Sequence, residues 1–199
     1  MDNKDSETRL RILGAALKRF AYSGYAGVSV QDIVDDALVT KPTLYYYFQS
    51  KSGLYQALLE WAYDERFRIL QKAASRHKLI SDRLTSILID MFKFLQRNRD
   101  LMRLAFATAF AAPGEIPEQI DYLKKANRNF EFLQTIFAEE LKAGGLNARF
   151  TSHELTMGFF GCMNIHVMSS LVNPKFKKLG PELARKIVRL YLEGASARK

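Results

Sequence analysis

The scarcity of proline and glycine is the feature that most limits the folds open to this 199-residue chain. There are five prolines and eleven glycines, and residues 54–112 contain neither. Sandwiches and barrels need frequent turns, and proline and glycine are the residues that most often make them. The distribution therefore predicts long helices and argues against a turn-rich all-β fold.

The composition is that of an ordinary globular protein. Hydrophobic residues make up 48% of the chain and charged residues 26%, so disorder is not expected for most of it. The single cysteine, Cys162, excludes an internal disulfide and fits a reducing compartment.

The chain is expected to be cytoplasmic and to have no membrane partner. The first eleven residues hold six charged side chains, which argues against a secretory signal. The stretch 155–173 contains no Lys, Arg, Asp or Glu, but it does contain Thr156, Asn164, His166, Ser169 and Ser170. Because so many polar groups are costly in a bilayer, we predict a helix that is buried by protein.

The net charge of +9 suggests a polyanionic partner, but its distribution does not locate one. Residues 1–51 carry seven basic and six acidic groups, a balance of +1, which leaves +8 for the remainder. Between Asp36 and Glu60 there is no acidic residue, whereas Lys41 and Lys51 stand there among several tyrosines. This local pattern indicates a nucleic-acid surface better than the total charge does.

Apolar residues recur with helical spacing along the whole chain, as in the first helix, where we expect Leu10, Leu13, Leu17 and Phe20 to face inward. Helices are predicted over about 6–23, 30–37, 41–47, 51–76, 82–98, 100–112, 117–143 (one long or broken helix), 152–171 and 181–196. The predicted fold class is all-α. Residues 1–51 are expected to form a three-helix helix-turn-helix domain, and residues 52–199 a helical domain for ligand binding and dimerisation.

Residues 29–51 read SVQDIVDDALVTKPTLYYYFQSK and carry the strongest functional pattern. Two short helices joined by a tight turn, packed on a longer first helix, suffice to place a helix in the major groove of DNA. Leu44 and Phe48 are four residues apart and should face the core, while Tyr46 lies about 200° from Leu44 and should face outward. Three consecutive tyrosines cannot all be buried on one helix.

The string T-K-P-T-L-Y-Y-Y-F-x-S-K at 40–51 resembles the recognition helix and following turn of the TetR family. Ser29-Val30 with Asp32-Ile33, and Phe20 with Gly24, match the family's earlier helices, so the resemblance covers roughly residues 8–60. It implies a dimeric transcriptional repressor that binds a palindromic DNA operator and is released by a small, largely apolar ligand.

The resemblance also implies a role for each matching residue at the DNA. Base edges would be approached by Gln31, Lys41, Pro42 and Tyr46. The sugar-phosphate backbone would be contacted by Thr43, Tyr45, Tyr47 and Lys51, with Lys51 pairing with a phosphate. Ser29 and Thr40 have hydroxyls suited to helix capping or to phosphate. For Tyr45 the alternative is packing on the first helix.

Leu38 departs from the family pattern, which commonly has glycine after the alanine at the end of the second helix. If the turn requires a left-handed backbone here, leucine would store strain of roughly 1–2 kcal/mol. The sequence therefore predicts that glycine at this position stabilises the protein.

Phenylalanine and methionine are concentrated in the C-terminal part, either as simple core or as the wall of an apolar cavity. The resemblance implies a cavity, but no pattern selects its residues. Our candidates for ligand binding are Met91, Phe106, Phe110, Phe130, Phe137, Phe160 and Asn164. For Asn164 the alternative is a hydrogen bond within the core.

The last two helices have the position of the family's dimer interface, and the alternative is that they only close the core of one chain. The candidate interface residues are Gly158, Gly161, Cys162, Leu183, Ile187, Leu190 and Tyr191. No metal site, cofactor or catalytic residue is expected, because the His and Cys residues lack ligand spacing and no nucleophile or phosphate-loop motif is present.

Two rival functions remain open. One is a DNA-binding dimer without a small ligand, which a cavity filled by its own phenylalanines would favour. The other is an enzyme or carrier that uses the aromatic pocket and retains the N-terminal motif without using it.

Overall fold

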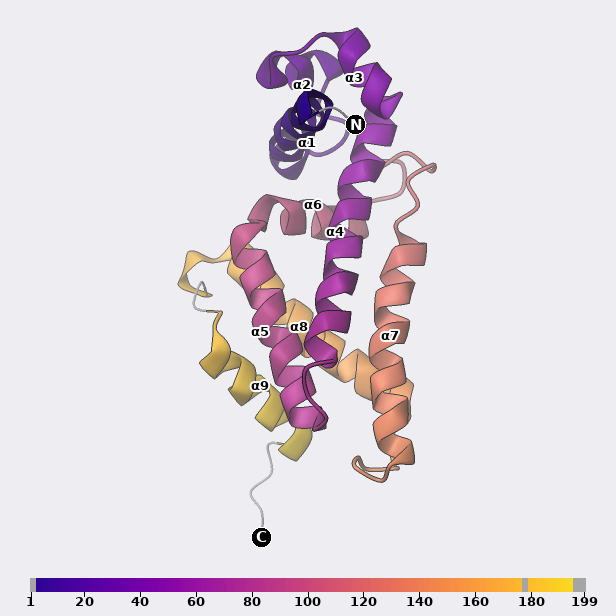
Figure 1. Ribbon diagram of the computed structural model, residues 1–199, viewed down its shortest axis with the longest axis vertical. Coiled ribbons are helices and arrows are strands. Elements are labelled where there is room, and N and C mark those ends of the chain that lie inside the picture. Colours follow the sequence, from indigo (N-terminus) through magenta and orange to yellow (C-terminus); the bar gives the residue numbers. More distant parts are fainter. Residues whose placement is uncertain (1–2, 177–178, 195–199) are drawn as a thin grey trace. The chain divides into compact units, whose positions relative to one another are not determined.

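The computed structural model describes residues 3–176 and 179–194, and within these ranges every regular element is a helix. Figure 1 shows their order along the chain. The elements are α1 (Asn3–Ser23), α2 (Val30–Ala37), α3 (Lys41–Phe48), α4 (Lys51–Ala74), α5 (Ile80–Arg97), α6 (Arg99–Ala109), α7 (Leu123–Lys142), α8 (Ser152–Val172), the 3-10 helix η1 (Pro174–Phe176) and α9 (Pro181–Glu193). The predicted all-α fold class is confirmed.

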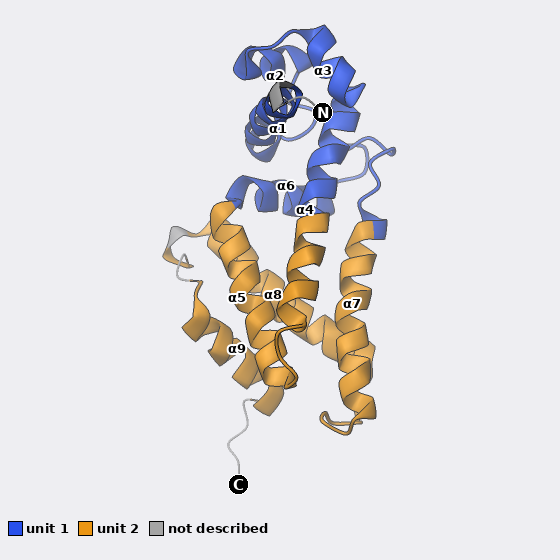
Figure 2. Ribbon diagram, in the orientation of Figure 1, with its two compact units in different colours: residues 1–63, 98–124 blue, residues 64–97, 125–199 orange. Residues whose placement is uncertain are grey.

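Figure 2 shows that the chain divides into two compact units. The first comprises residues 1–63 and 98–124, and the second comprises residues 64–97 and 125–199. This division falls inside α4, after residue 63, and the domains predicted from the sequence are 1–51 and 52–199, with the boundary within the fourth helix. It also assigns α6 and the segment after it to the first unit, which sequence spacing did not indicate.

The first unit is built on α1, which packs against α2 and α6. The buried face of α1 includes Ile12, Leu13, Ala16 and Phe20. Leu10 is 61% exposed, so the expectation that it faces inward is wrong. The apolar face that is buried runs through Ile12, Leu13, Ala16 and Phe20, with spacings of three or four residues from one helical turn to the next, and it does not include Leu10.

The core of this unit receives side chains from all of its helices. Ile33 and Val34 come from α2, Leu44 and Phe48 from α3, and Leu104 from α6. The expected inward orientation of Leu44 and Phe48 is thereby confirmed.

In the second unit α5 is the central helix, and α9 and α8 pack against it. Its buried face includes Leu84, Ile87, Leu88, Met91 and Leu95.

The remaining helices start and stop close to their predicted positions, with one exception. The segment 117–122 is not helical, so α7 begins at Leu123 rather than at Pro117. The predicted end of the last helix, at residue 196, lies outside the described residues.

Candidate nucleic-acid interface

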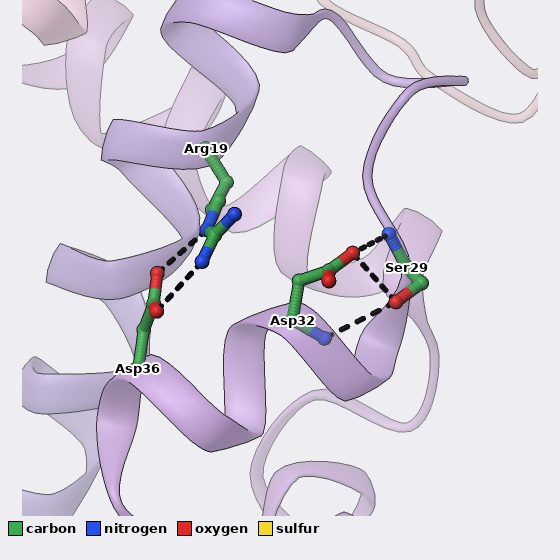
Figure 3. Close-up of polar contacts among 4 residues, drawn as sticks. All are labelled: Arg19, Ser29, Asp32 and Asp36. Atoms are coloured by element: carbon green, nitrogen blue, oxygen red, sulfur yellow. Dashed lines mark hydrogen bonds and ion pairs between the residues drawn. The ribbon is translucent and has the colours of Figure 1, made fainter.

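The N-terminus of α2 is closed by a reciprocal pair of hydrogen bonds, which Figure 3 shows. Ser29 Oγ accepts from the Asp32 backbone N–H at 3.1 Å, and the Asp32 carboxylate accepts from the Ser29 N–H at 2.8 Å and its hydroxyl at 2.6 Å. The hydrogen bonds from the Ser29 hydroxyl and N–H hold the pKa of Asp32 below its usual value. The Ser29 hydroxyl thus caps a helix, one of the two roles predicted for it.

The turn between α2 and α3 contains Leu38 in the left-handed region, with φ 53° and ψ 50°. Its N–H donates to the Asp35 carbonyl at 3.2 Å, and the next N–H, of Val39, donates to the Val34 carbonyl at 3.0 Å. These bonds complete the end of α2 and require the left-handed residue. The side chain of Leu38 is 82% exposed, so little packing offsets the backbone strain.

Helix α3 begins with the Thr40 side chain accepting from the Thr43 N–H, while the two hydroxyls lie 2.9 Å apart. Pro42 stands in the first turn, where its missing N–H is not needed. Both threonine hydroxyls are therefore engaged within the protein before any DNA is present.

The three tyrosines of α3 differ in exposure, as expected from helical geometry. Tyr46 is 76% exposed and Tyr45 is 44% exposed. Tyr47 is half-buried, and its hydroxyl donates to Asp5 Oδ1 of α1 at 3.0 Å. Burial and the Asp5 hydrogen bond raise the pKa of Tyr47. Tyr45 and Tyr46 thus present free surface, whereas the Tyr47 hydroxyl joins α3 to α1.

Gln31 and Lys41 are exposed at the first turns of α2 and α3 respectively. The Gln31 amide donates to Asp35 Oδ1 at 2.7 Å, which orients the side chain along the surface of α2. Together with Pro42, Tyr45 and Tyr46, these residues form an exposed surface that we call the recognition surface.

Lys51 does not lie on the recognition surface. Its ammonium donates to the backbone carbonyls of Tyr25 at 2.9 Å and Val28 at 2.8 Å. The same ammonium lies 4.1 Å from the centroid of the Tyr25 ring. Burial lowers the pKa of Lys51. Neither Tyr25 nor Asp5 was predicted as a site residue, because both act through contacts with residues distant in sequence.

The seven predicted ligand residues divide between the units. In the first unit, Phe110 at the end of α6 is 72% exposed and Phe106 is half-buried. In the second unit, Met91 and Phe137 are fully buried in the core. Phe130 and Phe160 pack edge to face with centroids 5.9 Å apart, and Asn164 is half-buried. A surface hollow of about 390 Å³ lies elsewhere and is lined by Leu179, Gly180, Pro181, Glu182, Leu183 and Lys186.

The predicted interface residues also fall into two groups. Gly158, Gly161 and Leu190 are exposed, whereas Ile187 is buried and Leu183, Cys162 and Tyr191 are half-buried. The Tyr191 ring packs against Phe137 and Phe159, and its hydroxyl donates to the Leu155 carbonyl. Burial raises the pKa of Tyr191 to about 12. Ile187 and Tyr191 therefore serve the core of their own unit.

Helix α8 is the most apolar element among the described residues. By length and composition Ser152–Val172 is sufficient to cross a membrane, and 33% of that stretch is buried inside the protein. One face holds the buried Phe159, Met163 and Val167. The exposed residues Met157, Gly161, Ile165 and Val172 follow one another along another face. The helix is thus covered on one side only by its own chain.

The short helices α2 and α3 are both capped at their N-termini and pack with the longer helix α1, and α3 carries two exposed tyrosines. This arrangement defines a helix-turn-helix protein. Residues 12–58 match the family model described as "Bacterial regulatory proteins, tetR family". The N-terminal part of the chain is thus similar to the TetR family. The similar proteins found by comparison are named as transcriptional regulators.

Two curated relatives illustrate the similarity. The uncharacterized HTH-type transcriptional regulator YdgC of Bacillus subtilis is 29% identical over 110 residues, which are 53% of this chain and 56% of the relative. The HTH-type transcriptional activator FasR of Mycolicibacterium smegmatis is 28% identical over 120 residues, which are 60% of this chain and 55% of the relative. The chain thus spans about half the length of the curated relatives it matches.

Solved structures share the fold over nearly the whole chain. The TetR-family regulator PfmR from Thermus thermophilus has a TM-score of 0.77 at 20% identity, covering 94% of this chain and 97% of that one. FadR from Bacillus subtilis, solved in complex with stearoyl-CoA, has a TM-score of 0.75 at 19% identity, covering 94% and 99%. At this identity the likeness establishes the fold.

Proposed function

We propose that the protein is a transcriptional repressor that binds a palindromic DNA operator as a homodimer and is released by a small, largely apolar ligand. The observation that carries the proposal is the recognition surface. Tyr45, Tyr46 and Lys41 are exposed on a helix whose first turn is capped and whose opposite face is held in the core by Leu44 and Phe48. A helix that is packed in the core on one face and exposed to solvent on the other is suited to bind in the major groove.

Dimerisation is supported by the uncovered face of α8. Met157, Ile165 and Val172 are 55%, 56% and 80% exposed, and Gly161 between them allows close approach of another helix. Exposed Leu190 on α9 extends the apolar surface. A second copy of the chain would bury both helices. It would also supply a second recognition helix for the other half-site, roughly 34–36 Å away.

Release would require a ligand to favour one arrangement of the dimer over another, with a coupling of about 1–3 kcal/mol. Helix α4 contributes residues to both compact units, so we propose that it transmits the effect of ligand binding from the second unit to the DNA-binding unit. The half-buried aromatic pair Phe130 and Phe160 is the best-placed candidate for ligand contact in the second unit. Since FadR of Bacillus subtilis was solved with stearoyl-CoA, fatty acyl thioesters are the first ligands to test.

A DNA-binding dimer without a small ligand is the second candidate. Met91 and Phe137 are 1% and 0% exposed, as expected for residues that fill the core rather than line an open cavity. That the protein represses transcription, rather than activating it, is also part of the proposal. The relative FasR is named as an activator.

Selection of the purified protein on random duplex DNA at two salt concentrations tests the proposal. Recovery of a palindrome, with affinity that falls steeply as salt rises, is the expected result. Addition of stearoyl-CoA to the selected duplex should then release the protein, with a ligand-dependent rise in melting temperature. A palindrome without release by any acyl thioester would favour the ligand-free regulator, and recovery of no motif would overturn the regulator altogether.

A further inference from the structure

The hydroxyl of Tyr47 has an anionic acceptor within the protein. It donates to Asp5 Oδ1 at 3.0 Å, and Asp5 lies 42 positions earlier, in the first turn of α1. The pKa of Tyr47 is raised, first by burial and then by this hydrogen bond, so the hydroxyl keeps its proton and is a donor at neutral pH. A residue that the family resemblance assigns to the sugar-phosphate backbone is thus engaged before DNA is bound.

This contact lies beside the recognition surface. The Tyr47 ring meets the Tyr46 ring edge to face, with centroids 5.0 Å apart, and Tyr46 is 76% exposed. The next residue of α3, Phe48, has the guanidinium of Arg9 5.3 Å from the centroid of its ring. Asp5 and Arg9 are four residues apart, so they share one face of α1, and this face adjoins the last turn of α3. An acidic side chain of α1 therefore stands next to the helix that we propose to bind DNA.

A carboxylate and a phosphate are alike in what they offer to a phenol. Both are anionic acceptors, and both form charge-assisted hydrogen bonds with a hydroxyl. We propose that Asp5 holds the Tyr47 hydroxyl in place of a DNA phosphate and thereby lowers the affinity of the protein for DNA. The hydroxyl exchanges Asp5 for a phosphate oxygen when the operator binds. This inference rests on the proposed function, and it retains the backbone contact of Tyr47 that the family resemblance implies.

The exchange is possible because Asp5 is exposed, so water can hydrate its carboxylate once the hydroxyl has left. DNA binding then loses the net strength of one solvent-exposed hydrogen bond, which corresponds to about two- to tenfold in affinity. The carboxylate also repels nearby phosphate groups, an effect that salt screens. Asp5 thus acts against DNA binding in two ways, and only the first of them requires the Tyr47 hydroxyl.

Removal of the carboxylate should strengthen DNA binding. We would titrate the selected duplex with full-length wild type, Asp5→Ala and Glu7→Ala at several salt concentrations, below each melting temperature. Glu7 is the matched control, since it is another exposed acidic residue of α1. Asp5→Ala should bind about two- to tenfold more tightly than wild type. Its advantage over Glu7→Ala should persist at high salt, because exchange of a hydrogen-bond acceptor is screened much less than charge repulsion. Unchanged or weaker binding by Asp5→Ala, or a gain no larger than that of Glu7→Ala, overturns the proposal.

The Tyr47→Phe background separates competition for the hydroxyl from simple charge repulsion. This substitution removes the donor and keeps the ring, so Asp5→Ala should then gain no more affinity than Glu7→Ala gains. An equal gain from Asp5→Ala in both backgrounds would mean that the carboxylate acts only through its charge, and the inference would be wrong. Asp5→Asn keeps a neutral acceptor, so its affinity should lie between those of wild type and Asp5→Ala.

Failure of this inference is distinguishable from failure of the proposed function. If the wild type selects a palindromic duplex and Asp5→Ala gains nothing, the regulator stands and the role of Asp5 is refuted. If neither the wild type nor Asp5→Ala selects a duplex, the proposed function fails, and the inference fails with it. If Asp5 instead orders α3 for DNA binding, Asp5→Ala weakens binding, and this opposite sign refutes the competition.

Discussion

Arg19 of α1 and Asp36 of α2 are joined by two parallel hydrogen bonds, from Nε to Oδ2 at 2.6 Å and from an η nitrogen to Oδ1 at 2.7 Å (Figure 3). This two-point contact fixes both the separation and the rotation of the two helices at the end of α2 opposite the Ser29 cap. It is a surface contact, with both side chains about 40% exposed, so orientation is its main contribution.

The Arg19–Asp36 pair predicts a loss of stability in acid. The hydrogen bond from Arg19 lowers the pKa of Asp36 below its unfolded value of about 3.9. A carboxyl with a depressed folded pKa contributes stability above the unfolded pKa and loses it as pH falls through the folded value. Melting temperatures between pH 7 and pH 2 should therefore fall less steeply for Asp36→Asn, which already lacks the charge, than for wild type. Equal pH profiles for the two proteins would contradict this assignment.

Leu38→Gly should stabilise the protein by about 1–2 kcal/mol, because glycine adopts the left-handed backbone without strain. The leucine side chain is 82% exposed, so its removal forfeits little packing. For a chain of this size each kcal/mol corresponds to a rise of roughly 2–4 °C in melting temperature. Leu38→Ala is the control, since alanine removes the side chain but keeps the strain, and it should not raise the melting temperature.

The hydroxyls of Tyr55 and Thr108 form a buried hydrogen bond of 2.7 Å between α4 and α6 within the first unit. Thr108→Val should cost about 1–3 kcal/mol, because it leaves the Tyr55 hydroxyl buried without a partner. Tyr55→Phe should cost less, about 0.5–1.5 kcal/mol, since Thr108 still donates to the Leu104 carbonyl. Urea unfolding of both variants and of the double variant measures the coupling, and additive losses would show that the two hydroxyls do not interact.

Tyr46→Ala should weaken binding to the selected duplex by about 1–3 kcal/mol, the range for one good base contact, without lowering the melting temperature. The reason is its 76% exposure on the recognition surface. Tyr22→Ala is a suitable control, because Tyr22 is a similarly exposed aromatic residue, at 69%, on α1. If both variants bind as wild type does, Tyr46 is not part of the DNA interface.

If the proposed dimer forms through α8, Ile165→Glu should convert it to a monomer by placing a charge on the uncovered apolar face of that helix. Because a monomer offers one recognition helix, binding to a palindrome should weaken together with dimerisation. Sedimentation equilibrium measures the first effect and a duplex titration the second. Thr135→Glu on the exposed face of α7 is the matched control and should remain dimeric. A dimeric Ile165→Glu would move the interface away from α8.

The sequence predicted most of the helices and the exposed residues of α3, because both depend on short-range patterns. The caps Ser29 and Thr40, the proline in the first turn of α3 and the outward orientation of Tyr46 all follow from residues within four positions of one another. The left-handed backbone at Leu38 was expected only as a condition raised by the family resemblance, and the structure has φ 53° there.

Only the tertiary structure decided which side chains make contacts between residues distant in the sequence. Lys51 contacts carbonyls more than twenty positions earlier, Tyr47 contacts Asp5, and α6 packs against α1 in the first unit. No spacing along the chain encodes such contacts, because they depend on how separate helices meet. Similarly, periodicity identified the apolar residues of α8 and α9, but only packing separated the buried Ile187 from the exposed Leu190. The reason is physical: burial depends on the neighbouring helix, and a helical pattern specifies a face without specifying what covers it.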